Sequence, residues 1–364
     1  MSAATADVAI IGGGIVGAAC ARALANEKLR VVVIESRDVA SGATAAGMGH
    51  IVAMDDSEAQ FALTAYSSKL WAQLRPSLPK SAEYEACGTL WIAADDEEMR
   101  AVRAKREFYC ERGARVEVLD ETALRAAEPQ LRAGLAGALL VPGDSVIYAP
   151  CAAHWLAEQA RERGAWIRQG VEVLGVSPGL VKLNDGSTLS AGAVVVAAGT
   201  ASALLIPGLP VRPRKGYLAI TDRYPGFVRH QLVELGYLKS AHGHDNESVA
   251  FNAQPRSTGQ VLIGSSRQYG DGRSLVAPML RRAFEYMPGL AELSVIRTWT
   301  GLRAATPDSL PLIGPLDGGL WTATGHEGLG ITTSLGTAQL IADQLLSRPT
   351  AIPAEPYLPS RFTA

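Results

Sequence analysis

An excess of charge of one sign is absent from this 364-residue sequence. Its 34 lysines and arginines are balanced by 36 aspartates and glutamates, which gives a formal net charge of −2. Proteins that bind nucleic acid neutralise phosphates with clustered basic residues. Because no basic stripe is present, the sequence predicts that nucleic acid is not a partner.

Cysteine is also scarce. The four cysteines are Cys20, Cys87, Cys110 and Cys151. They form no C-x-x-C pair and have no histidine at ligand spacing, so neither a zinc site nor an iron–sulfur cluster is expected. His242 and His244 lack a third ligand at motif spacing, which favours an exposed turn over a metal site. Isolated thiols in apolar surroundings are typical of a reducing compartment, and we expect a cytoplasmic protein.

Long hydrophobic runs are missing as well. The chain reaches its first apolar strand near Val8 without a basic segment or a cleavage site, and no later run has spanning length. These features predict a soluble protein, and they leave peripheral contact with the inner face of a membrane open. By contrast, hydrophobic residues make up 48% of the chain and glycine is plentiful, at 37 residues. A large core with many tight turns is therefore expected, in one large or two interleaved domains.

The first 35 residues have the pattern of a strand–helix–strand unit. An apolar strand is expected from Asp7 to Ile11, a helix from Ile15 to Ala25, and a second buried strand from Arg30 to Ile34. Between the first strand and the helix lies GGGIVG, residues 12–17, with the G-x-G-x-x-G spacing. Glu35 follows the second strand. This combination is typical of a dinucleotide-binding fold.

Each part of this motif has a physical role. Gly12 permits the tight turn, Gly14 lets the backbone approach a pyrophosphate, and Gly17 lets helix and strand pack closely. The helix N-terminus offers N–H groups and a positive dipole to phosphate, and Glu35 can accept hydrogen bonds from both ribose hydroxyls. That carboxylate would repel a 2′-phosphate, which disfavours NADP, although Arg37 nearby weakens the argument. FAD and NAD remain open, and the alternative is a glycine-rich turn that binds no nucleotide.

The next segments leave this unit. Ser41 to His50, SGATAAGMGH, is rich in small residues and suits a backbone that lies against a flat ligand. Residues 57–75 are expected to form an amphipathic helix, stopped by Pro76. Its predicted inward residues are Phe61, Ala65, Leu70, Trp71 and Leu74.

The chain later returns to the first sheet. A helix is expected from Ala149 to Arg163, and strands from Val171 to Val176 and from Leu180 to Leu183. The apolar run Val194–Ala198 predicts a fully buried strand that ends at Gly199, where the chain can again approach a nucleotide. The nucleotide domain is thus expected to be discontinuous.

A different pattern follows between residues 205 and 298. Alternating strands are expected at Gly216–Thr221, Ser248–Ala253 and Gln260–Ser265, with a helix from Ser274 to Met287. This pattern favours an antiparallel sheet with one covered face. From Arg348 onward the proline-rich chain is expected to be a surface tail.

The C-terminal section contains a second glycine-rich helix start. A strand from Leu320 to Thr324 precedes GHEGLGIT, residues 325–332, which opens a helix to Leu346. Its N-terminal amides could stabilise negative charge on a reduced flavin. Its spacing does not suit another dinucleotide, so the electron donor should be a small substrate.

Together these residues resemble the D-amino-acid oxidase type of FAD-dependent amine oxidoreductases, a family that includes glycine oxidase, sarcosine oxidase and D-amino-acid dehydrogenase. The resemblance rests on GGGIVG at 12–17, Glu35, SGATAAG at 41–47, CGTLWIA at 87–93, VVVAAGT at 194–200, GLRAATPDSLPLIG at 301–314 and TGHEGLGIT at 324–332. The GHEGLGITT ending looks most like flavoprotein subunits such as that of D-hydroxyproline dehydrogenase.

The resemblance implies an α/β fold in which a Rossmann-like FAD-binding domain is interleaved with an antiparallel-sheet substrate domain. We expect residues 1–85, 141–204 and 299–364 in the FAD-binding domain. The substrate domain is expected to comprise residues 86–140 and 205–298.

The resemblance also implies where FAD binds. The expected contacts are Gly12, Gly14, Gly17 and Glu35 on the ADP half, Val173 near the adenine, Gly199, and, around the isoalloxazine, Ser41, Thr44, Ala45, Gly47, Met48, Glu327, Gly328, Leu329, Gly330, Ile331 and Thr332. The implied reaction is hydride transfer from the substrate Cα to flavin N5, driven by the amine lone pair, so no side-chain base is assigned.

Three residues are candidates for the substrate. Arg303 matches the family position that holds the substrate carboxylate, and a bidentate guanidinium suits that role; the alternative is an internal ion pair with Asp308 or a neighbouring acid. His50 and His326 follow or begin the glycine-rich loops and could line the substrate site. Gly301 stands where sarcosine oxidase attaches its flavin through cysteine, which implies non-covalent FAD.

The expected activity is the oxidation of a D-amino acid or a secondary (imino) amino acid, with D-hydroxyproline as the narrowest expectation. One alternative is a non-catalytic flavin-binding subunit that helps assemble a heteromeric dehydrogenase. Another is an NAD-dependent dehydrogenase, which would leave VVVAAGT and GHEGLGIT without a purpose. The subunit-like ending predicts partner redox subunits.

Overall fold

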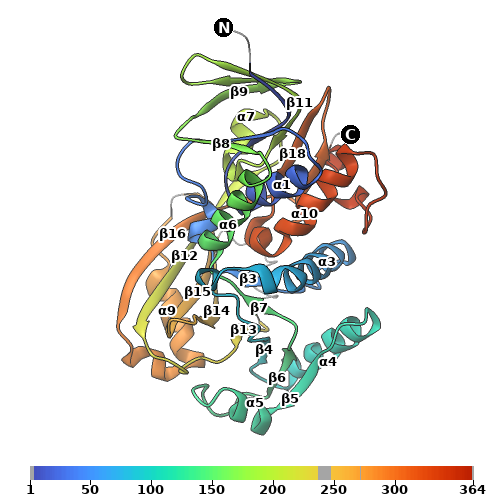
Figure 1. Ribbon diagram of the computed structural model, residues 1–364. Coiled ribbons are helices and arrows are strands. Elements are labelled where there is room, and N and C mark those ends of the chain that lie inside the picture. Colours follow the sequence, from blue (N-terminus) through green and yellow to red (C-terminus); the bar gives the residue numbers. More distant parts are fainter. Residues whose placement is uncertain (1–3, 237–246, 271, 363–364) are drawn as a thin grey trace. The chain divides into compact units, whose positions relative to one another are not determined.

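The computed structural model describes residues 4–236, 247–270 and 272–362 (Figure 1). His242 and His244 lie outside the described residues. The chain divides into two compact units. Unit 1 comprises Met1–Ala82, Tyr148–Pro213 and Leu302–Ala364, and unit 2 comprises Glu83–Ile147 and Arg214–Gly301.

Unit 1 is built on a mostly parallel sheet with the order β17-β18-β11-β1-β2-β8. Its strands are β1 (Ala4–Ile11), β2 (Val31–Glu35), β8 (Trp166–Gln169), β11 (Thr188–Val196), β17 (Leu312–Pro315) and β18 (Leu320–Thr324), with β9 (Val173–Ser177) and β10 (Leu180–Leu183) attached to β11. The central strand β1 pairs in parallel with β2 and with β11. Strands β2 and β11 are therefore neighbours of one strand although they are far apart in sequence, so the sheet joins distant parts of the chain.

Helices of unit 1 pack around this sheet. They are α1 (Ile15–Asn26), α2 (Ala43–Ala46), α3 (Glu58–Leu74), α6 (Ala149–Arg161), α7 (Ser202–Leu205) and α10 (Gly330–Leu345). Helix α1 packs against α6 and α10, and α10 packs against α3 (Figure 1). A short strand, β3 (His50–Ile51), also belongs to this part of the chain. The start of α10 is thereby surrounded by elements from the first 80 residues.

Unit 2 is built on a second sheet, with the order β16-β12-β15-β14-β13-β4-β6-β5. The strands are β4 (Thr89–Ala93), β5 (Glu117–Asp120), β6 (Gly137–Val141), β12 (Arg212–Arg223), β13 (Gln231–Glu234), β14 (Glu247–Pro255), β15 (Gln260–Gln268) and β16 (Val295–Ala305). From β12 to β5 in this order the paired strands run antiparallel, except β13 and β4, which are parallel. A further short strand is β7 (Ser145–Val146), and the helices are α4 (Asp96–Glu111), α5 (Glu121–Ala127) and α9 (Val276–Tyr286).

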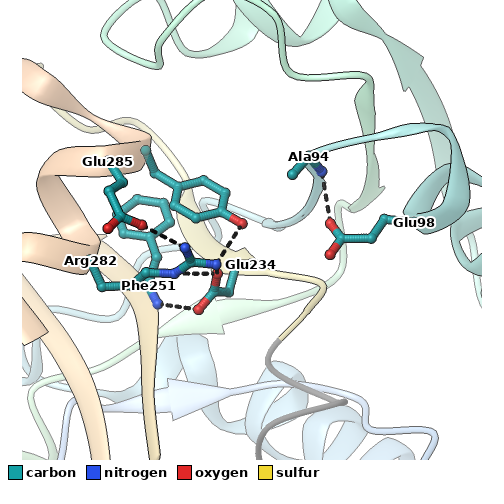
Figure 2. Close-up of polar contacts among 7 residues, drawn as sticks. Ala94, Glu98, Glu234, Phe251, Arg282 and Glu285 are labelled. Atoms are coloured by element: carbon teal, nitrogen blue, oxygen red, sulfur yellow. Dashed lines mark hydrogen bonds and ion pairs between the residues drawn. The ribbon is translucent and has the colours of Figure 1, made fainter.

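A buried ion pair fastens α9 to this sheet (Figure 2). The carboxylate of Glu234, 2% exposed, accepts a hydrogen bond from the Phe251 N–H at 2.8 Å and pairs with the Arg282 guanidinium. Arg282 also contacts Glu285 at 2.6 Å. Removing Arg282, whose side chain is 38% exposed, would leave the Glu234 carboxylate as an uncompensated buried charge. The pair therefore fixes how α9 covers the apolar face of the sheet.

Short 3₁₀ helices complete the fold: η1 (Arg75–Ser77), η2 (Lys80–Ala82), η3 (Gly199–Ala201), η4 (Pro288–Glu292), η5 (Glu327–Leu329), η6 (Glu355–Tyr357) and η7 (Pro359–Phe362). The predicted α/β fold class, with a parallel sheet and an antiparallel one, is confirmed. Among the described residues no helix is long and apolar enough to cross a membrane.

The predicted inward face of the helix at 57–75 is partly wrong. Phe61 and Trp71 are buried, whereas Ala65, Leu70 and Leu74 are only partly buried. The residues buried instead include Gln60, Leu63, Thr64 and Ser67. The reason is that α3 packs against α10, where a Cβ added at Gly336 would lie 2.3 Å from Ser67 Oγ. Small residues at this contact let the two backbones approach closely.

The prediction of a surface tail from Arg348 onward is only partly correct, because two residues of this segment are buried. Tyr357 is 1% exposed, and its hydroxyl donates to the Ala59 carbonyl at 2.6 Å. Arg348 pairs with Glu27, and Arg361 pairs with Asp308 at 2.7 Å. The proline content predicted a surface tail. One large aromatic ring and two arginines attach that tail to the rest of unit 1.

Candidate functional site

The glycine loop at residues 12–17 connects β1 to α1, and two of its glycines are dictated by packing. Gly12 has φ +109°, and a Cβ there would lie 2.6 Å from the Ala197 carbonyl oxygen. A Cβ on Gly17 would lie 2.0 Å from the Gly12 carbonyl oxygen. At Gly14 the nearest atom to an added Cβ is Thr44 Oγ1, at 3.3 Å. Gly12 and Gly17 therefore shape the loop, while Gly14 keeps room at the start of the helix.

The start of α1 suits an anion. Its N-cap is Gly14, which has no side chain to cap the helix, and its first turn holds no acidic residue. The Ile15 N–H donates to Thr44 Oγ1 at 3.0 Å, and Thr44 is buried. An α-helix gives its first N–H groups no intrahelical partner, and its dipole is positive at this end. This donor set and the space beside Gly14 fit a phosphate group.

Glu35 lies at the end of β2, next to the same loop. Its Oε2 accepts from the Gly13 N–H at 2.6 Å, and its Oε1 accepts from the Arg37 N–H at 2.9 Å. A Cβ on Gly13 would lie 3.1 Å from Glu35 Cβ. Gly13, which the sequence analysis did not single out, is therefore the glycine that lets the carboxylate reach the loop. The G-x-G-x-x-G spacing leaves this position unspecified, so it gave no signal.

Four further predicted positions lie around this loop and the neighbouring strands. Ser41 and Ala45 flank Thr44 in and before the short helix α2 (Ala43–Ala46). Val173 opens β9 and packs, partly buried, against the core of the parallel sheet. Gly199, three residues after the end of β11, has φ +56°, and its carbonyl accepts from Thr324 Oγ1 at 3.0 Å. The ends of β11 and β18 are thus tied together on the edge where β1 meets α1.

The segments 44–48 and 327–332, predicted to share a ligand, do lie together. A Cβ on Gly47 would lie 2.8 Å from the Ile331 side chain. Thr332 Oγ1 donates to the His50 carbonyl at 2.9 Å, so the segment that follows Met48, itself 9% exposed, is bonded to α10. These contacts place the small-residue segment against the start of α10.

Sequence analysis missed the role of Trp71 in this arrangement. The indole Nε1–H of this buried residue donates to the Ile331 carbonyl at 3.2 Å and to the Thr332 carbonyl at 3.1 Å. From the sequence, Trp71 is an apolar residue of an amphipathic helix. Only the packing of α3 on α10 turns its N–H toward the second glycine-rich helix start.

The second glycine-rich loop has an unusual backbone. Glu327 has φ +46°, a left-handed conformation that costs a non-glycine residue about 1–2 kcal/mol. The Leu329 N–H donates to the His326 carbonyl at 2.9 Å, and Gly330 begins α10 without a side-chain cap at its N-cap, Leu329. Gly328 and Gly330 keep this turn narrow. The loop therefore presents backbone, not side chains, at the helix start.

His326 is 8% exposed, and its Nε2 lies 3.0 Å from Thr337 Oγ1. Burial lowers the pKa of the imidazole to about 3, so the ring is neutral at pH 7. Thr337 is a residue of α10. This geometry favours a structural role for His326, which holds the second glycine-rich loop against α10. His50, in contrast, is half-buried on β3.

Arg303 lies on β16, beside the second glycine-rich loop. Its Nε would be 4.0 Å from a Cβ on Gly328. The acid weighed as its ion-pair partner, Asp308, is bonded by Arg361 instead, at 2.7 and 3.1 Å. Burial alone would raise the pKa of the Asp308 carboxyl, but hydrogen bonds from Arg361 and the Leu310 N–H hold it below its usual value. Asp308 therefore has an ion-pair partner in Arg361.

Unit 2 has a polar sheet face that the sequence analysis also missed. In the ladders, Gln231 is opposite Thr89, and Val233 is opposite both Trp91 and Asn252, so these side chains share one face. Within the described residues, four buried atoms on this face have no hydrogen-bond partner: Thr89 Oγ1, Trp91 Nε1, Gln231 Oε1 and Asn252 Oδ1. Such atoms are rare in folded proteins. They suit a neutral group that both donates and accepts.

No cluster of three or more histidine, cysteine, aspartate or glutamate side chains in the described part of the chain could hold a metal ion. All four cysteines are free, and burial raises the pKa of the Cys20 and Cys87 thiols to about 12. The candidate chemistry therefore rests on the glycine-rich loops, Arg303 and the buried polar groups around them.

Comparison with protein families gives one match that spans most of the chain. The model of the DAO family, described as FAD dependent oxidoreductase, matches residues 7–344. The matched range includes both glycine-rich loops, Glu35 and Arg303.

Proteins of known activity align over most of the chain. A glycine oxidase from Geobacillus kaustophilus is 30% identical over 96% of both chains. Hydrogen cyanide synthase subunit HcnC from Pseudomonas aeruginosa is 27% identical over 98% of this chain and 96% of its own. A D-amino acid dehydrogenase from Methylobacterium nodulans is 31% identical over 82% of this chain and 73% of its own.

Solved structures agree with these alignments. The glycine oxidase from Geobacillus kaustophilus superposes with a TM-score of 0.87 at 29% identity, covering 98% of this chain and 99% of that one. The L-proline dehydrogenase from P. horikoshii superposes with a TM-score of 0.88 at 26% identity, covering 99% and 98%.

Proposed function

Because the chain belongs to the family of FAD dependent oxidoreductases, we propose that its unit 1 holds the cofactor and that the protein oxidises the α-carbon of an amino acid. Its cofactor is FAD. Its class of enzyme is that of its relatives, the FAD-dependent amino-acid oxidases and dehydrogenases, which act on CH–NH2 or CH–NH donors. The observation that carries the proposal is the start of α1, where space and unshared donors fit a phosphate.

We assign the ADP half of FAD to the first loop. Gly12 and Gly17 shape this loop, Gly14 keeps room for the pyrophosphate, and the first turn of α1 supplies N–H donors. Glu35 would hold the ribose. Its Oε1 and Oε2 each have lone pairs left after the bonds to Gly13 and Arg37, because an ionised carboxylate can accept about four hydrogen bonds. Val173 and Gly199 complete this half.

We assign the isoalloxazine to the second loop and to the segment packed against it. Its proposed neighbours are Ser41, Thr44, Ala45, Gly47, Met48 and residues 327–332. The contact between Gly47 and Ile331 supports this assignment, because one planar ligand can then touch both segments. The backbone at the start of α10 would supply donors where negative charge develops. Gly301 supports non-covalent attachment.

Arg303 is assigned to the substrate carboxylate. Its guanidinium lies beside the second loop, and Asp308 is already held by Arg361. A bidentate pair with the carboxylate would fix the orientation of the substrate Cα. When bound, FAD supplies a hydride acceptor at N5, so the amino acid is oxidised to an imine that water hydrolyses. The substrate amine need only be neutral, so no side chain is required as a base. His50 and His326 complete the proposed surroundings, with His326 as a neutral buried ring.

The narrower proposal is a D-configured or secondary amino acid, with D-hydroxyproline as the leading candidate. The relatives named for D-amino acids and for L-proline each support one part of this choice.

We also propose that the chain works beside partner redox subunits. The support is that a relative matching 98% of this chain is named as a subunit. The same observation favours the second candidate, a flavin-binding assembly subunit without catalysis.

The free cysteines fit a reducing compartment, and we therefore place the protein in the cytoplasm. Contact with the inner face of the membrane would be made by a partner subunit.

The decisive experiment is an anaerobic titration of the purified yellow protein. We expect the flavin absorbance to bleach with at least one of glycine, D-alanine, D-proline, L-proline and hydroxy-D-proline, with the hydroxylated ring more effective than D-proline. Lactate and ethanol serve as controls. Bleaching by a 2-hydroxy acid or an alcohol, and by no amino acid, would contradict the substrate class. FAD binding without bleaching by any donor would support the assembly subunit.

A further inference from the structure

Trp71 makes a contact that a residue needed only for packing does not require. Its ring is 0% exposed on α3, and its Nε1–H is shared between the carbonyls of Ile331 and Thr332, at 3.2 and 3.1 Å. Both carbonyls belong to the first turn of α10, which begins at Gly330. A buried indole N–H needs an acceptor, but the acceptor here is the start of one particular helix.

A hydrogen bond to a carbonyl also affects the N–H group at the other end of the same peptide unit. The Ile331 carbonyl and the Thr332 N–H belong to one peptide unit. Because Thr332 is in the first turn, the helix offers its N–H no intrahelical acceptor. A donor on the carbonyl polarises the peptide group, and linked hydrogen bonds strengthen one another in this way. The bond from Trp71 therefore makes the Thr332 N–H a stronger donor.

The same peptide group is held from other sides. Ser334 Oγ also donates to the Ile331 carbonyl, at 3.0 Å, and Thr332 Oγ1 donates to the His50 carbonyl at 2.9 Å. The Ile331 side chain lies against Gly47, where a Cβ would approach it to 2.8 Å. A donor fixed by several contacts needs no reorganisation when charge develops near it.

We propose that Trp71 is a positioning residue that sets the reduction potential of the bound FAD. Through the Ile331–Thr332 peptide group it would strengthen the stabilisation that the first turn of α10 gives to negative charge on the reduced cofactor. The inference rests on the proposed function, because it uses the assignment of residues 327–332 to the isoalloxazine. It goes beyond that assignment by naming a residue of α3 that the cofactor need not touch.

The test is the two-electron midpoint potential of the FAD-loaded protein, measured by equilibration with a redox dye. Trp71→Phe keeps an aromatic ring and removes the N–H. We expect reduction of the variant to become about tenfold less favourable, which is a potential about 30 mV more negative for a two-electron couple. The matched control is Trp166→Phe, which makes the same exchange at a side chain of β8 that is 54% exposed. The control should leave the potential unchanged.

Ser334→Ala provides a second, milder variant should Trp71→Phe fold poorly. It removes the other side-chain donor to the Ile331 carbonyl, so the potential should shift in the same direction by a smaller amount. Unchanged potentials in variants that hold FAD, with only the melting temperature lowered, would overturn the proposal and leave Trp71 a packing residue. Failure of the wild-type protein to bind FAD would instead refute the proposed function, so the two failures are distinguishable.

Discussion

At the residue scale, we expect Gly14 to be needed for FAD binding and Gly17 to be needed for folding. A Cβ on Gly17 would lie 2.0 Å from a backbone oxygen, which cannot move away without distorting the loop. We expect Gly17→Ala to lower the free energy of unfolding by at least about 3 kcal/mol. At Gly14 the nearest atom is 3.3 Å away, so Gly14→Ala should stay folded and lose FAD affinity at least about tenfold, which corresponds to about 1.4 kcal/mol.

Thermal unfolding and FAD titration of the two apoproteins would check this difference. Gly143→Ala is the control, because an added Cβ there meets nothing within 4 Å. Equal FAD affinity in Gly14→Ala and the wild-type protein would refute the assignment of the pyrophosphate to this loop.

Arg303 is expected to matter for turnover and not for the cofactor. Arg303→Ala should keep FAD bound and lose about 2 to 4 kcal/mol in kcat/KM for amino acids, the scale of a charge-assisted pair at a desolvated site. Arg303→Lys should recover only part of this loss, because an ammonium cannot bind a carboxylate with a planar fork. Steady-state kinetics beside a flavin absorbance spectrum would measure both effects.

Arg361→Ala is the matched control for Arg303. It removes an arginine that binds a carboxylate of the chain itself, Asp308, so it should lower stability and leave KM unchanged. If Arg303→Ala behaves like Arg361→Ala, Arg303 has a structural role only.

His326 predicts a pH dependence of stability. Burial lowers its pKa from 6.5 to about 3, so between these values the unfolded chain binds a proton that the folded chain does not. Protonation of this residue therefore does not lower the free energy of unfolding above pH 6.5, and it lowers that free energy progressively as the pH drops toward 3. The loss is about 2 kcal/mol by pH 5, at about 1.36 kcal/mol for each pH unit. Urea unfolding at pH 7 and pH 5 should show a smaller difference for His326→Gln, and an equal difference would contradict a buried neutral ring.

At the scale of elements, the packing of α3 on α10 can be tested by compensation. A Cβ on Gly336 would lie 2.3 Å from Ser67 Oγ, an atom with no hydrogen-bond partner in the part of the chain that the structure describes. We expect Gly336→Ala to destabilise the protein by about 1–3 kcal/mol. Adding Ser67→Ala should restore most of that loss.

A double-mutant cycle of unfolding free energies would measure the coupling between Gly336 and Ser67. Neighbours in contact couple by about 0.5–3 kcal/mol, whereas independent sites add. Additive effects would mean that α3 and α10 are farther apart than described. This contact matters for the cofactor, because α3 brings Trp71 to the start of α10.

At the scale of the whole molecule, the electron acceptor determines whether the protein acts alone or together with a partner subunit. The chain has four free cysteines and one dinucleotide fingerprint, so electrons from FAD would pass to oxygen or to a partner subunit. If it is the subunit of a heteromer, the isolated chain should bleach rapidly with substrate and turn over slowly in air. An oxygen electrode and a peroxide assay on purified protein would measure this. Rapid peroxide release would establish a self-sufficient oxidase and refute the need for a partner.

How much could be predicted from the sequence depends on the range of the interactions involved. The first strand–helix–strand unit, its glycine loop and Glu35 were predicted because the hydrophobic period, the turn glycines and the terminal acid all lie within 35 residues. The strand Leu320–Thr324 and the helix after it were predicted for the same reason. Motifs of this kind also carried the family resemblance, which the family match over residues 7–344 confirms.

The remainder was decided by contacts between distant segments. Trp71 lies 260 positions before Ile331, and the tail residue Tyr357 binds Ala59 across 298 positions. Arg361 pairs with Asp308 across 53 positions. Periodicity shows which residues avoid water, but it does not show which polar atom meets which across the core. The sequence by itself therefore determined the fold class and the cofactor, and the tertiary structure decided which groups surround the two glycine-rich loops.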